Sequence, residues 1–486
     1  MTYTVKSGGR EFCLNIGLEI HCEITSESKL FSAQSAKFGG APNTRVSFFD
    51  AGFPGQLPVL NDYCIDQAIK TGLGLSAKIN GFSVFARKHY FYADLPAGYQ
   101  ISQFDRPLVS GGAVEVTDDG GNPKSVRIER LHVEQDAGKL SHDKDPSRSM
   151  VDFNRAGVGL MEIVSRPDMS SPKEVGEYVR SIRALVRYLG TCDGNMDEGS
   201  MRCDINVSLR PVGSGDLGTR TETKNVNSVK FAMQAVEYEA GRQAEILASG
   251  GKVVQETRLF DAATGTTRPM RNKENAIDYR YFPDPDIMPL VLEEGRVERI
   301  RASMPELPAA KRERLKSELG LSDYDARQIA ADRDVAEYFE ETARLSGDGK
   351  AAANWILSEL FAHLNAGGLD IAQSSVRPPH LAELISLVKE GEISGRMAKD
   401  IFAEMFSDAE KSARRIASKK GLRQISDPDE IGRVIDGIMA ANPENVKKYR
   451  AGKAQIFGWF VGQAIKETKG LANPDMVNEI LKGKLA

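Results

Sequence analysis

The chain has 486 residues, of which 41% are hydrophobic and 27% are charged, and its formal net charge is −4 at pH 7. This composition is ordinary for a soluble globular protein, and at roughly 150 residues per domain it predicts about three domains. No apolar run approaches the ~20 residues that a membrane helix needs, and the first residues show no apolar signal core. We therefore expect a cytoplasmic protein that does not associate with membranes.

Cysteine usage excludes two classes of stabilised fold. No two of the cysteines form a CxxC pair, so neither a disulfide framework nor a zinc ribbon is indicated. The pattern predicts reduced, mostly buried thiols. The five cysteines are Cys13, Cys22, Cys64, Cys192 and Cys203.

The first predicted element is a strand over residues 14–24, in which apolar and polar residues alternate. A period of two places the apolar set on one face and the polar set on the other. The polar face carries Glu19, His21 and Glu23, whose carboxylate and imidazole groups suit a divalent metal such as Mg²⁺. A polar sheet face turned to solvent is the alternative explanation. The apolar set is Leu14, Ile16, Leu18, Ile20 and Ile24.

Three later segments also place carboxylate or amide groups on strand-like polar faces. Their chemistry-bearing residues are Glu134, Gln135 and Asp136 in HVEQDAGK (132–139), Arg202, Asp204 and Asn206 in MRCDINVSLR (201–210), and Glu222 and Lys224 in TETKNVNS (221–228). Each segment alone is a weak signal. If these strands meet at one cleft, they form a basin of carboxylates for Mg²⁺ and nucleotide phosphates. Their convergence stays open at this level.

The order of elements predicts an α+β fold. Helices over 171–189 and 229–248 lie among the strands without regular βαβ alternation, which favours a mainly antiparallel sheet. The pattern after Pro289 is helical, and near the end Asn473 and Pro474 read as the N-cap and first residue of a last helix. We predict a mixed domain over 1–295, a helical domain over 296–410 and a helical tail domain over 411–486.

The predicted tail domain is basic. Residues 411–486 contain 15 Lys and Arg against 8 Asp and Glu, a charge of +7, which leaves −11 for the rest of the chain. A basic unit on an acidic body fits an electrostatic contact with a phosphate backbone. A solvated helical surface is the alternative. The apolar stripe in this domain is typical of core packing; it consists of Phe457, Phe460, Val461, Ala464 and Ile465.

Several catalytic motifs are missing from the sequence. There is no GxxxxGK[ST] loop and no protein-kinase motif set, so any use of ATP is not of the P-loop or kinase type. There is also no G-x-S-x-G elbow and no cysteine in a Cys-His nucleophile context. A chain that performs amide chemistry without a glutaminase site must receive ammonia from elsewhere.

Long motifs resemble one known family across nearly the whole chain. The N-terminal motifs are GLEIHCE (17–23), KLFS (29–32), PGQLPVLN (54–61), RKHYFYADLPAGYQISQFD (87–105), HVEQDAGK (132–139), DFNRAGVGLMEIVSRPD (152–168), EGSMRCDINVSLRP (198–211), TETKNVNS (221–228) and DYRYFPDPDIMPL (278–290). Residues 452–481 resemble the tail domain of the same family. In order and spacing these segments are similar to the B subunits of the glutamyl-tRNA(Gln)/aspartyl-tRNA(Asn) amidotransferases.

This resemblance implies a catalytic cradle whose sheet resembles that of glutamine synthetase and the guanido kinases. It also implies a helical domain, a tail that holds tRNA, and partners in a heterotrimer: an amidase A subunit that frees ammonia from glutamine and a small C subunit. The family's metal-binding carboxylate motifs map onto Glu19, His21, Glu134, Asp204 and Glu222, which become the expected catalytic and metal-binding residues.

The sequence departs from the family pattern at two places. Many relatives hold zinc with CxC followed by CxxC, where this chain has Ser32-Ala33-Gln34 and Ser47-Phe48-Phe49-Asp50, so we expect no zinc there. Relatives often carry a second Glu where this chain has Gln135. An amide oxygen there is a possible ligand but supplies no charge.

The resemblance implies ATP-dependent activation of the side-chain carboxylate of Glu-tRNA(Gln) or Asp-tRNA(Asn), followed by amidation with ammonia, with ATP and Mg²⁺ as cofactors. Arg202, Lys224 and Arg280 are the expected phosphate contacts, and structural ion pairs with cradle carboxylates are an equal alternative for them. Two other functions stay open: a stand-alone ligase of the glutamine-synthetase type, and a non-catalytic scaffold that binds tRNA.

Overall fold

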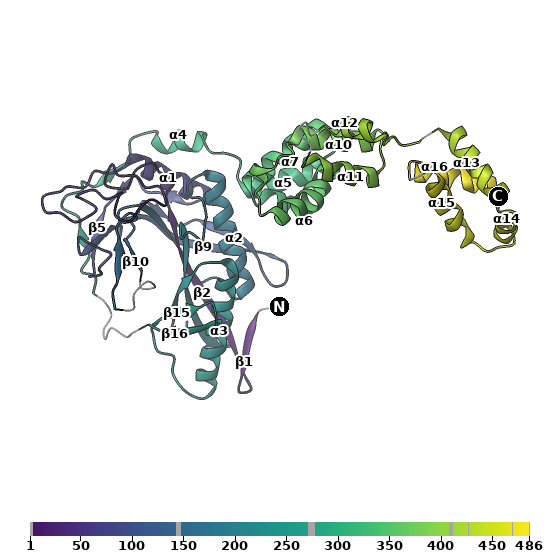
Figure 1. The fold of residues 1–486 in the computed structure, drawn as a ribbon. Helices are drawn as coiled ribbons and strands as arrows, with labels where there is room; N and C mark the ends of the chain where they lie inside the picture. Colours follow the sequence, from purple (N-terminus) through teal and green to yellow (C-terminus); the bar gives the residue numbers. More distant parts are fainter. Residues whose placement is uncertain are drawn as a thin grey trace. The chain divides into compact units, whose positions relative to one another are not determined.

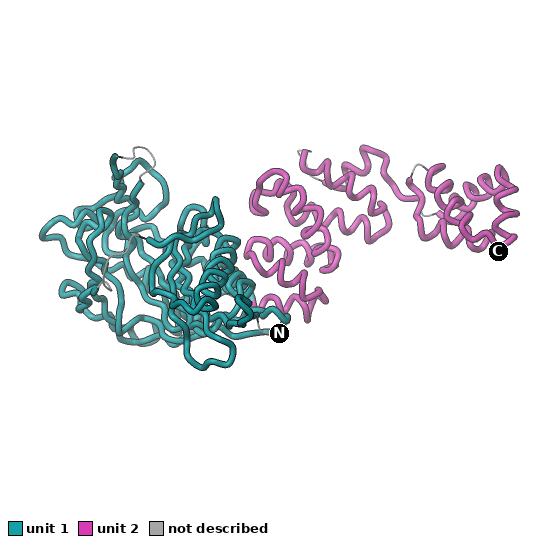
Figure 2. Tube along the Cα trace, turned by 90° about the horizontal axis from the view of Figure 1, so that it is seen from below, with its two compact units in different colours: residues 1–308 teal, residues 309–486 magenta. Residues whose placement is uncertain are grey.

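The computed structural model describes residues 3–141, 147–270, 278–407, 412–425, 427–468 and 470–485 (Figure 1). The chain divides into two compact units, Met1–Pro308 and Ala309–Ala486 (Figure 2). Unit 1 contains the strands and unit 2 is helical, so the predicted mixed α+β region followed by a helical region is confirmed. The finer domain boundaries at residues 295 and 410 stay predictions.

Unit 1 is built on an 11-stranded sheet with the path β16-β15-β14-β13-β2-β12-β9-β7-β3, while β1 pairs with β2 and β8 with β9. Its ladders are antiparallel except for β14 with β15, which confirms the mainly antiparallel sheet. The strands are β1 (Thr4–Ser7), β2 (Arg10–Glu23), β3 (Lys78–Ile79), β4 (Phe82–Ser83), β5 (Ala86–His89), β6 (Tyr99–Ser102), β7 (Val109–Ser110), β8 (Ala113–Thr117), β9 (Pro123–Gln135), β10 (Lys139–Ser141), β11 (Met150–Asp152), β12 (Gly159–Ser165), β13 (Met201–Pro211), β14 (Thr221–Val226), β15 (Thr257–Asp261), β16 (Thr266–Pro269), β17 (Phe282–Pro283) and β18 (Leu290–Val291).

Four helices accompany the sheet in unit 1: α1 (Asp62–Gly74), α2 (Pro172–Leu189), α3 (Val229–Ala248) and α4 (Arg296–Ala302). Side chains fix where the two longest begin. Ser171 caps α2 by accepting a hydrogen bond from the backbone N–H of Glu174, and Ser228 caps α3 through the N–H of Phe231. Gly190 ends α2 at a φ of 69°, a left-handed conformation that glycine adopts without steric penalty.

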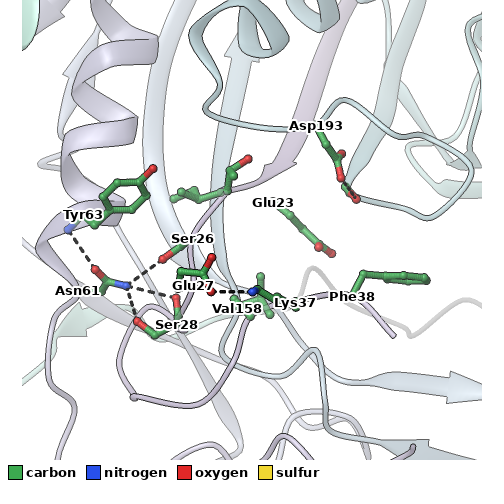
Figure 3. A pocket seen from close by; sticks show the side chains of 14 residues that line it. Glu23, Ser26, Glu27, Ser28, Lys37, Phe38, Asn61, Tyr63, Val158 and Asp193 are labelled. Carbon is green, nitrogen blue, oxygen red and sulfur yellow. Dashed lines mark hydrogen bonds and ion pairs between the residues drawn. The ribbon is translucent and has the colours of Figure 1, made fainter. Parts of the chain in front are cut away.

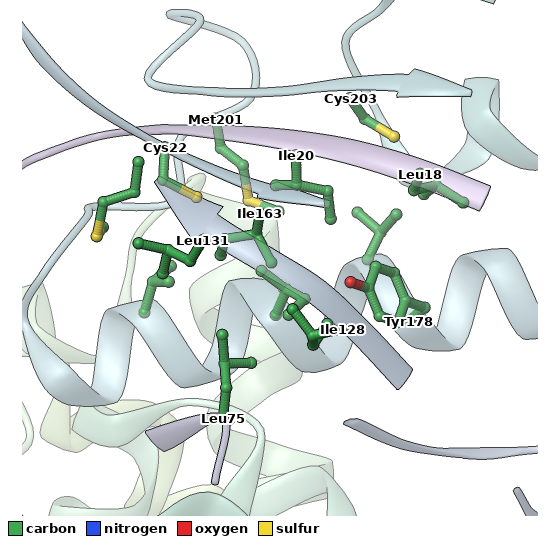
Figure 4. Packing of buried hydrophobic residues seen from close by; sticks show 14 of the residues in the cluster. Leu18, Ile20, Cys22, Leu75, Ile128, Leu131, Ile163, Tyr178, Met201 and Cys203 are labelled. Atoms are coloured by element: carbon green, nitrogen blue, oxygen red, sulfur yellow. The ribbon is translucent and has the colours of Figure 1, made fainter. Parts of the chain in front are cut away.

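One face of the sheet is apolar and packs against helices α1, α2 and α3. Leu18, Ile20 and Cys22 of β2 are buried in this layer, next to Tyr178 of α2 (Figure 4). The alternation predicted for residues 14–24 is therefore confirmed. Burial of such side chains contributes about 1.5–3 kcal/mol each, so the apolar face fixes which residues point the other way.

Unit 2 is helical and contains a separate small core near its end. Its helices are α5 (Pro308–Leu319), α6 (Asp323–Ala330), α7 (Arg333–Ser346), α8 (Gly349–Asn354), the π-helix η1 (Trp355–Leu360), α9 (Phe361–Gly367), the 3₁₀-helix η2 (Ile371–Gln373), α10 (Pro378–Lys389), α11 (Gly395–Met405), α12 (Ala413–Lys420), α13 (Pro428–Ala441), α14 (Pro443–Arg450), α15 (Ile456–Glu467) and α16 (Pro474–Leu485). The small core buries Phe460 and Ala464, which confirms the predicted stripe as packing. Asn473 caps α16 through the N–H of Asp475, as the sequence predicted.

The loop after β2 is held by a buried ion pair. The Lys29 Nζ lies 3.2 Å from Oδ2 of Asp50 and donates a 2.7 Å hydrogen bond to the carbonyl of Arg45. The Asp50 carboxylate also accepts hydrogen bonds from the Ser32 hydroxyl and the Ser47 N–H. These are positions where many relatives are expected to hold zinc. Burial lowers the pKa of Lys29, and the charge of Asp50 opposes that shift.

We expect Lys29→Met to lower the free energy of unfolding of unit 1 by about 3–5 kcal/mol, because it leaves the Asp50 carboxylate buried without its cation. Lys37→Met is the matched control in the same loop. Its partner Glu27 is exposed, so the expected loss is below about 1 kcal/mol.

Urea denaturation of the full chain, followed by far-UV circular dichroism, measures both variants. Trp355 and Trp459 are the only tryptophans in the chain and both lie in unit 2, so their fluorescence is an internal reference for that unit. Equal losses in the two variants would contradict a stabilising role for the buried pair.

Candidate functional site

The polar face of the sheet is organised by the register of β2 with its neighbours. His21 pairs across the ladders with Glu162 of β12 and Arg202 of β13, and Glu162 pairs in turn with His132 of β9. The adjacent row, two residues along β2, holds Glu19 opposite Asp204. Since side chains alternate, both rows point away from the helices.

The first carboxylate group of this face combines His21, Glu134 and Glu162. One ligand atom from each residue lies within 4.8 Å of the others, which is close enough for a shared metal ion. The His21 Nε2 is 3.8 Å from Glu134 and 3.6 Å from Glu162. His132 Nε2 lies behind them, 3.0 Å from Glu162 and 3.4 Å from Glu134. We call His21, Glu134 and Glu162 the inner cluster.

The second group, which we call the outer cluster, combines Glu19, Asp204 and Glu222, again within 4.8 Å of one another. Lys224, on the same strand β14 as Glu222, lies against it. The Lys224 Nζ is 2.6 Å from Asp204 and 2.9 Å from Glu222. The amide of Asn206 donates a 3.0 Å hydrogen bond to Glu19, which fixes the orientation of that carboxylate.

Electrostatic balance differs between the two clusters. Burial raises the pKa of Glu19, and the nearby carboxylates of Glu162, Glu222 and Asp204 raise it further. In the inner cluster burial also opposes ionisation of Glu162, but the charge of His132 and its hydrogen bond hold the pKa of Glu162 well below its usual range. His132 is affected reciprocally: burial opposes its charge, yet Glu162 and Glu134 raise its pKa to about 9.

A three-stranded sheet, β17-β5-β6, borders the inner cluster. Its Ser102 hydroxyl donates a 2.9 Å hydrogen bond to Glu134. Burial opposes the charge of Lys88 on β5, but Glu134 is its strongest electrostatic partner and the net effect raises the pKa of Lys88. The ammonium lies 5.1 Å from the ring centroid of Tyr279 and 5.8 Å from that of Tyr90, which is a cation–π arrangement.

A third acidic group flanks the inner cluster and extends to a cavity. Burial raises the pKa of Glu23 to about 8, and the charge of Asp136 adds to this shift. Glu23 lines a cavity of about 560 Å³ together with residues of the loop that follows β2 (Figure 3). In the same view Asn61 is hydrogen-bonded to Ser26 and Ser28, which holds that loop against the start of α1. The cavity therefore reaches the end of the polar face.

The structure brings together the five residues expected to bind metal, but divides them between two clusters. His21 and Glu134 lie in the inner cluster; Glu19, Asp204 and Glu222 lie in the outer one. These ligands are oxygen atoms and one imidazole nitrogen, a set that Mg²⁺ accepts, so the residues present fit this ion.

The three expected phosphate contacts differ in their surroundings. Lys224 lies in the outer cluster. Arg202 forms a 2.5 Å ion pair with Asp136 beside the inner cluster. A structural ion pair of this kind was the alternative to a phosphate contact for this residue. The Arg280 side chain is 82% exposed and lies 3.9 Å from Asp278, outside both clusters. Gln135 is also outside them; its backbone carbonyl accepts a hydrogen bond from Gln100.

Three residues of the site were missed by sequence reasoning: Glu162, His132 and Lys88. Glu162 interrupts the apolar run GLMEIVS (159–165), and a lone carboxylate in a buried strand is a signal that sequence inspection can detect. His132 begins the HVEQDAGK segment but was not assigned a role. Lys88 is separated from the clusters in sequence, and only the strand β5 places it there.

In the part of the chain that the structure describes, no helix is long and apolar enough to cross a membrane.

Comparison with known proteins shows the family of the chain. The model of the GatB/GatE catalytic domain matches residues 14–298, which contain both clusters, and the model of the GatB domain matches residues 337–485. Proteins named as the B subunit of aspartyl/glutamyl-tRNA(Asn/Gln) amidotransferase are similar over their whole lengths. The one from Rhodospirillum rubrum is 53% identical and the one from Paramagnetospirillum magneticum 52% identical, each over 100% of both chains. The one from Rickettsia conorii is 53% identical over 97% of both chains. The chain therefore belongs to the family of aspartyl/glutamyl-tRNA(Asn/Gln) amidotransferase B subunits.

Proposed function

We propose that this chain uses ATP to activate the side-chain carboxylate of Glu-tRNA(Gln) or Asp-tRNA(Asn), which ammonia then converts to the amide. The observation that carries the proposal is the pair of carboxylate clusters side by side on one polar sheet face. The names of the relatives support the substrate class. The cradle formed by this face is the part of the fold that we liken to glutamine synthetase and the guanido kinases.

The chemistry explains why ATP is needed. A carboxylate does not react with ammonia at neutral pH, because the leaving group would be oxide. Transfer of the γ-phosphoryl group to a carboxylate oxygen gives an acyl phosphate and ADP. Ammonia then attacks the acyl carbon, the C–O bond to phosphate breaks, and the nitrogen loses a proton as the amide forms.

The inner and outer clusters supply the ligands that this reaction needs for Mg²⁺. When held by these residues, Mg²⁺ would offset the negative charge that develops during phosphoryl transfer. The chain's own cations complement it. Lys224 contacts the outer cluster, and Lys88 interacts electrostatically with Glu134 of the inner one. Each would orient an anionic oxygen of the substrate or of a phosphate.

Ammonia must come from a partner, since the sequence shows no glutaminase motif. We propose that an amidase A subunit supplies it, that a small C subunit completes a heterotrimer, and that the basic tail holds the tRNA. The acyl phosphate hydrolyses in water, so its formation requires a closed cavity. The wall formed by β5, β6 and β17 supports such closure on the side of the inner cluster.

Asp204→Asn and Glu222→Gln are expected to reduce ATP-dependent amidation by the assembled complex about a hundredfold or more, because each removes a charged metal ligand from the outer cluster. Glutaminase activity is expected to stay unchanged. Glu115→Gln, on an exposed position of β8, is the matched control. Normal transamidation of Glu-tRNA and Asp-tRNA by the two variants would remove the outer cluster from the reaction.

Mn²⁺ soaked into crystals of the complex is expected to give anomalous peaks at the inner and outer clusters, because Mn²⁺ accepts the ligands of Mg²⁺. The Asp204→Asn variant is expected to lose only the outer peak. A non-catalytic scaffold predicts no peak beside Asp204, and that result would reject the proposed metal site.

Deletion of residues 411–486 is expected to weaken tRNA binding and to reduce the slope of log K against log [salt], because fewer phosphates are neutralised. Binding is measured between about 50 and 200 mM salt, where the counterion effect is large. An unchanged slope would show that the tail is not the phosphate contact. ATP hydrolysis stimulated by free glutamate as strongly as by Glu-tRNA would favour a stand-alone ligase instead.

A further inference from the structure

The Glu222 carboxylate of the outer cluster is held by a different partner on each of its two oxygen atoms. Lys224, on the same strand β14, lies 2.9 Å from Oε1. The Thr257 hydroxyl, on the neighbouring strand β15, donates a 2.8 Å hydrogen bond to Oε2. A rotation of the Glu222 carboxylate would therefore break a contact on each side.

The two contacts differ in what they permit. Lys224 carries a positive charge and also lies 2.6 Å from Asp204, so it opposes the approach of a divalent cation to both carboxylates. A hydroxyl is neutral, and its hydrogen bond occupies one lone pair of Oε2 while the other lone pairs of the carboxylate stay available to a cation. Thr257 is therefore the contact that Glu222 can keep while it acts as a metal ligand.

The position of Thr257 follows from a parallel ladder of the large sheet. β14 and β15 run parallel, with Thr257 opposite Glu222 and Arg258 opposite Thr223. The backbone N–H of Glu222 also donates a 3.0 Å hydrogen bond to the carbonyl of Glu256, so its backbone and its side chain contact successive residues. Because side chains alternate along a strand, Thr257 shares the polar face with Glu222, whereas Arg258 points to the helices.

A buried carboxylate on α3, the helix that packs against β14 and β16, fixes this register from the opposite face (Figure 1). Glu239 is fully buried and lies 2.9 Å from Nε of Arg258 on β15. It also accepts a 3.0 Å hydrogen bond from the Thr221 hydroxyl of β14 and another from the Thr267 hydroxyl of β16. One side chain therefore joins three adjacent strands. If β15 slid along β14, a buried charge would lose its partner, which is strongly unfavourable.

We propose that Thr257 is a positioning residue for the outer cluster: its hydroxyl holds the Glu222 carboxylate where it can bind a divalent cation. The inference rests on the proposed function and adds a residue that is not itself a ligand. Thr257 acts through Glu222, as the amide of Asn206 orients Glu19 in the same cluster. Without this hydroxyl Glu222 is held by Lys224, in an ion pair that competes with the cation.

The test is a titration of the assembled amidotransferase with Mn²⁺, without nucleotide or tRNA, in which electron paramagnetic resonance measures the free ion. Thr257→Val keeps the branched shape and removes the hydroxyl. We expect it to raise the Kd of the outer site about tenfold, because partners of metal ligands typically contribute about ten- to a hundredfold to affinity. Thr257→Ser retains the hydroxyl and is expected to bind Mn²⁺ nearly as tightly as the wild type.

Two further variants assign the sites and control for the loss of a hydroxyl. Asp204→Asn removes a ligand of the outer cluster and so identifies which of the two Kd values belongs to it. Thr264→Val is the matched control at the exposed turn between β15 and β16, where its hydroxyl lies 2.8 Å from that of Thr266. It is expected to leave both Kd values unchanged. In Thr257→Val the Kd of the inner site is also expected to stay unchanged.

Three results would overturn the inference while the proposed function stands. An unchanged outer Kd in Thr257→Val would show that Glu222 needs no hydroxyl partner. Equal weakening of both sites would show that the hydroxyl serves the structure of unit 1 as a whole. Weakening that Thr257→Ser does not reverse would show that the hydroxyl alone does not account for the effect. If the wild type binds no Mn²⁺ at the outer cluster, this inference and the proposed metal site both fail.

Discussion

The antiparallel pairing of β2 between β12 and β13 is the constraint on which the rest of unit 1 depends. Hydrogen bonding fixes which residues stand opposite one another, and the period of two fixes which face each side chain takes. Burial of Leu18, Ile20 and Cys22 against the helices determines the register. The acidic groups meet on the other face because the apolar groups must stay in the core. If the pairing register of β2 shifted by one residue, Glu19 and His21 would be buried in that core.

Collecting so many carboxylates on one surface is electrostatically unfavourable, and the molecule offsets it locally. Lys224 lies between Asp204 and Glu222, His132 supports Glu162, and Lys88 faces Glu134. Lys224 and His132 lie on the same strands of the large sheet as Glu222 and Glu134, whereas Lys88 belongs to the three-stranded sheet that borders the inner cluster. The pKa values of Glu134 and Glu162 in the inner cluster are lowered, whereas the pKa of Glu19 is raised even though Lys224 acts against that shift. A divalent ion would relieve the outer cluster most, since three carboxylates there share one lysine.

The sequence predicted which side chains share a face of the sheet better than it predicted which strands pair with one another. Alternation in residues 14–24 and 201–210 was sufficient to select Glu19, His21 and Asp204, because a local period determines direction. Alternation did not select Glu162, because the residues on both sides of it in its strand are apolar and the strand resembles a fully buried one. The contacts of Glu162 with polar residues follow only from the position of β12 between β2 and β9. Strand pairing joins residues that are far apart in the sequence, so a local pattern does not predict it. For this reason the sequence predicted neither the division into two clusters nor the ion pair of Arg202 with Asp136. The start of the last helix at Asn473 was accessible because capping is local.

The loop held by Lys29 has a consequence for the conditions that the protein tolerates. No cysteine lies between residues 29 and 50, so peroxide has no thiolate to oxidise there and a chelator has no metal–sulfur bond to break. The order of this loop depends instead on the contact between the buried Lys29 ammonium and the Asp50 carboxylate. The loop is therefore sensitive to the loss of either charge by mutation, because the remaining charge would be buried without its partner.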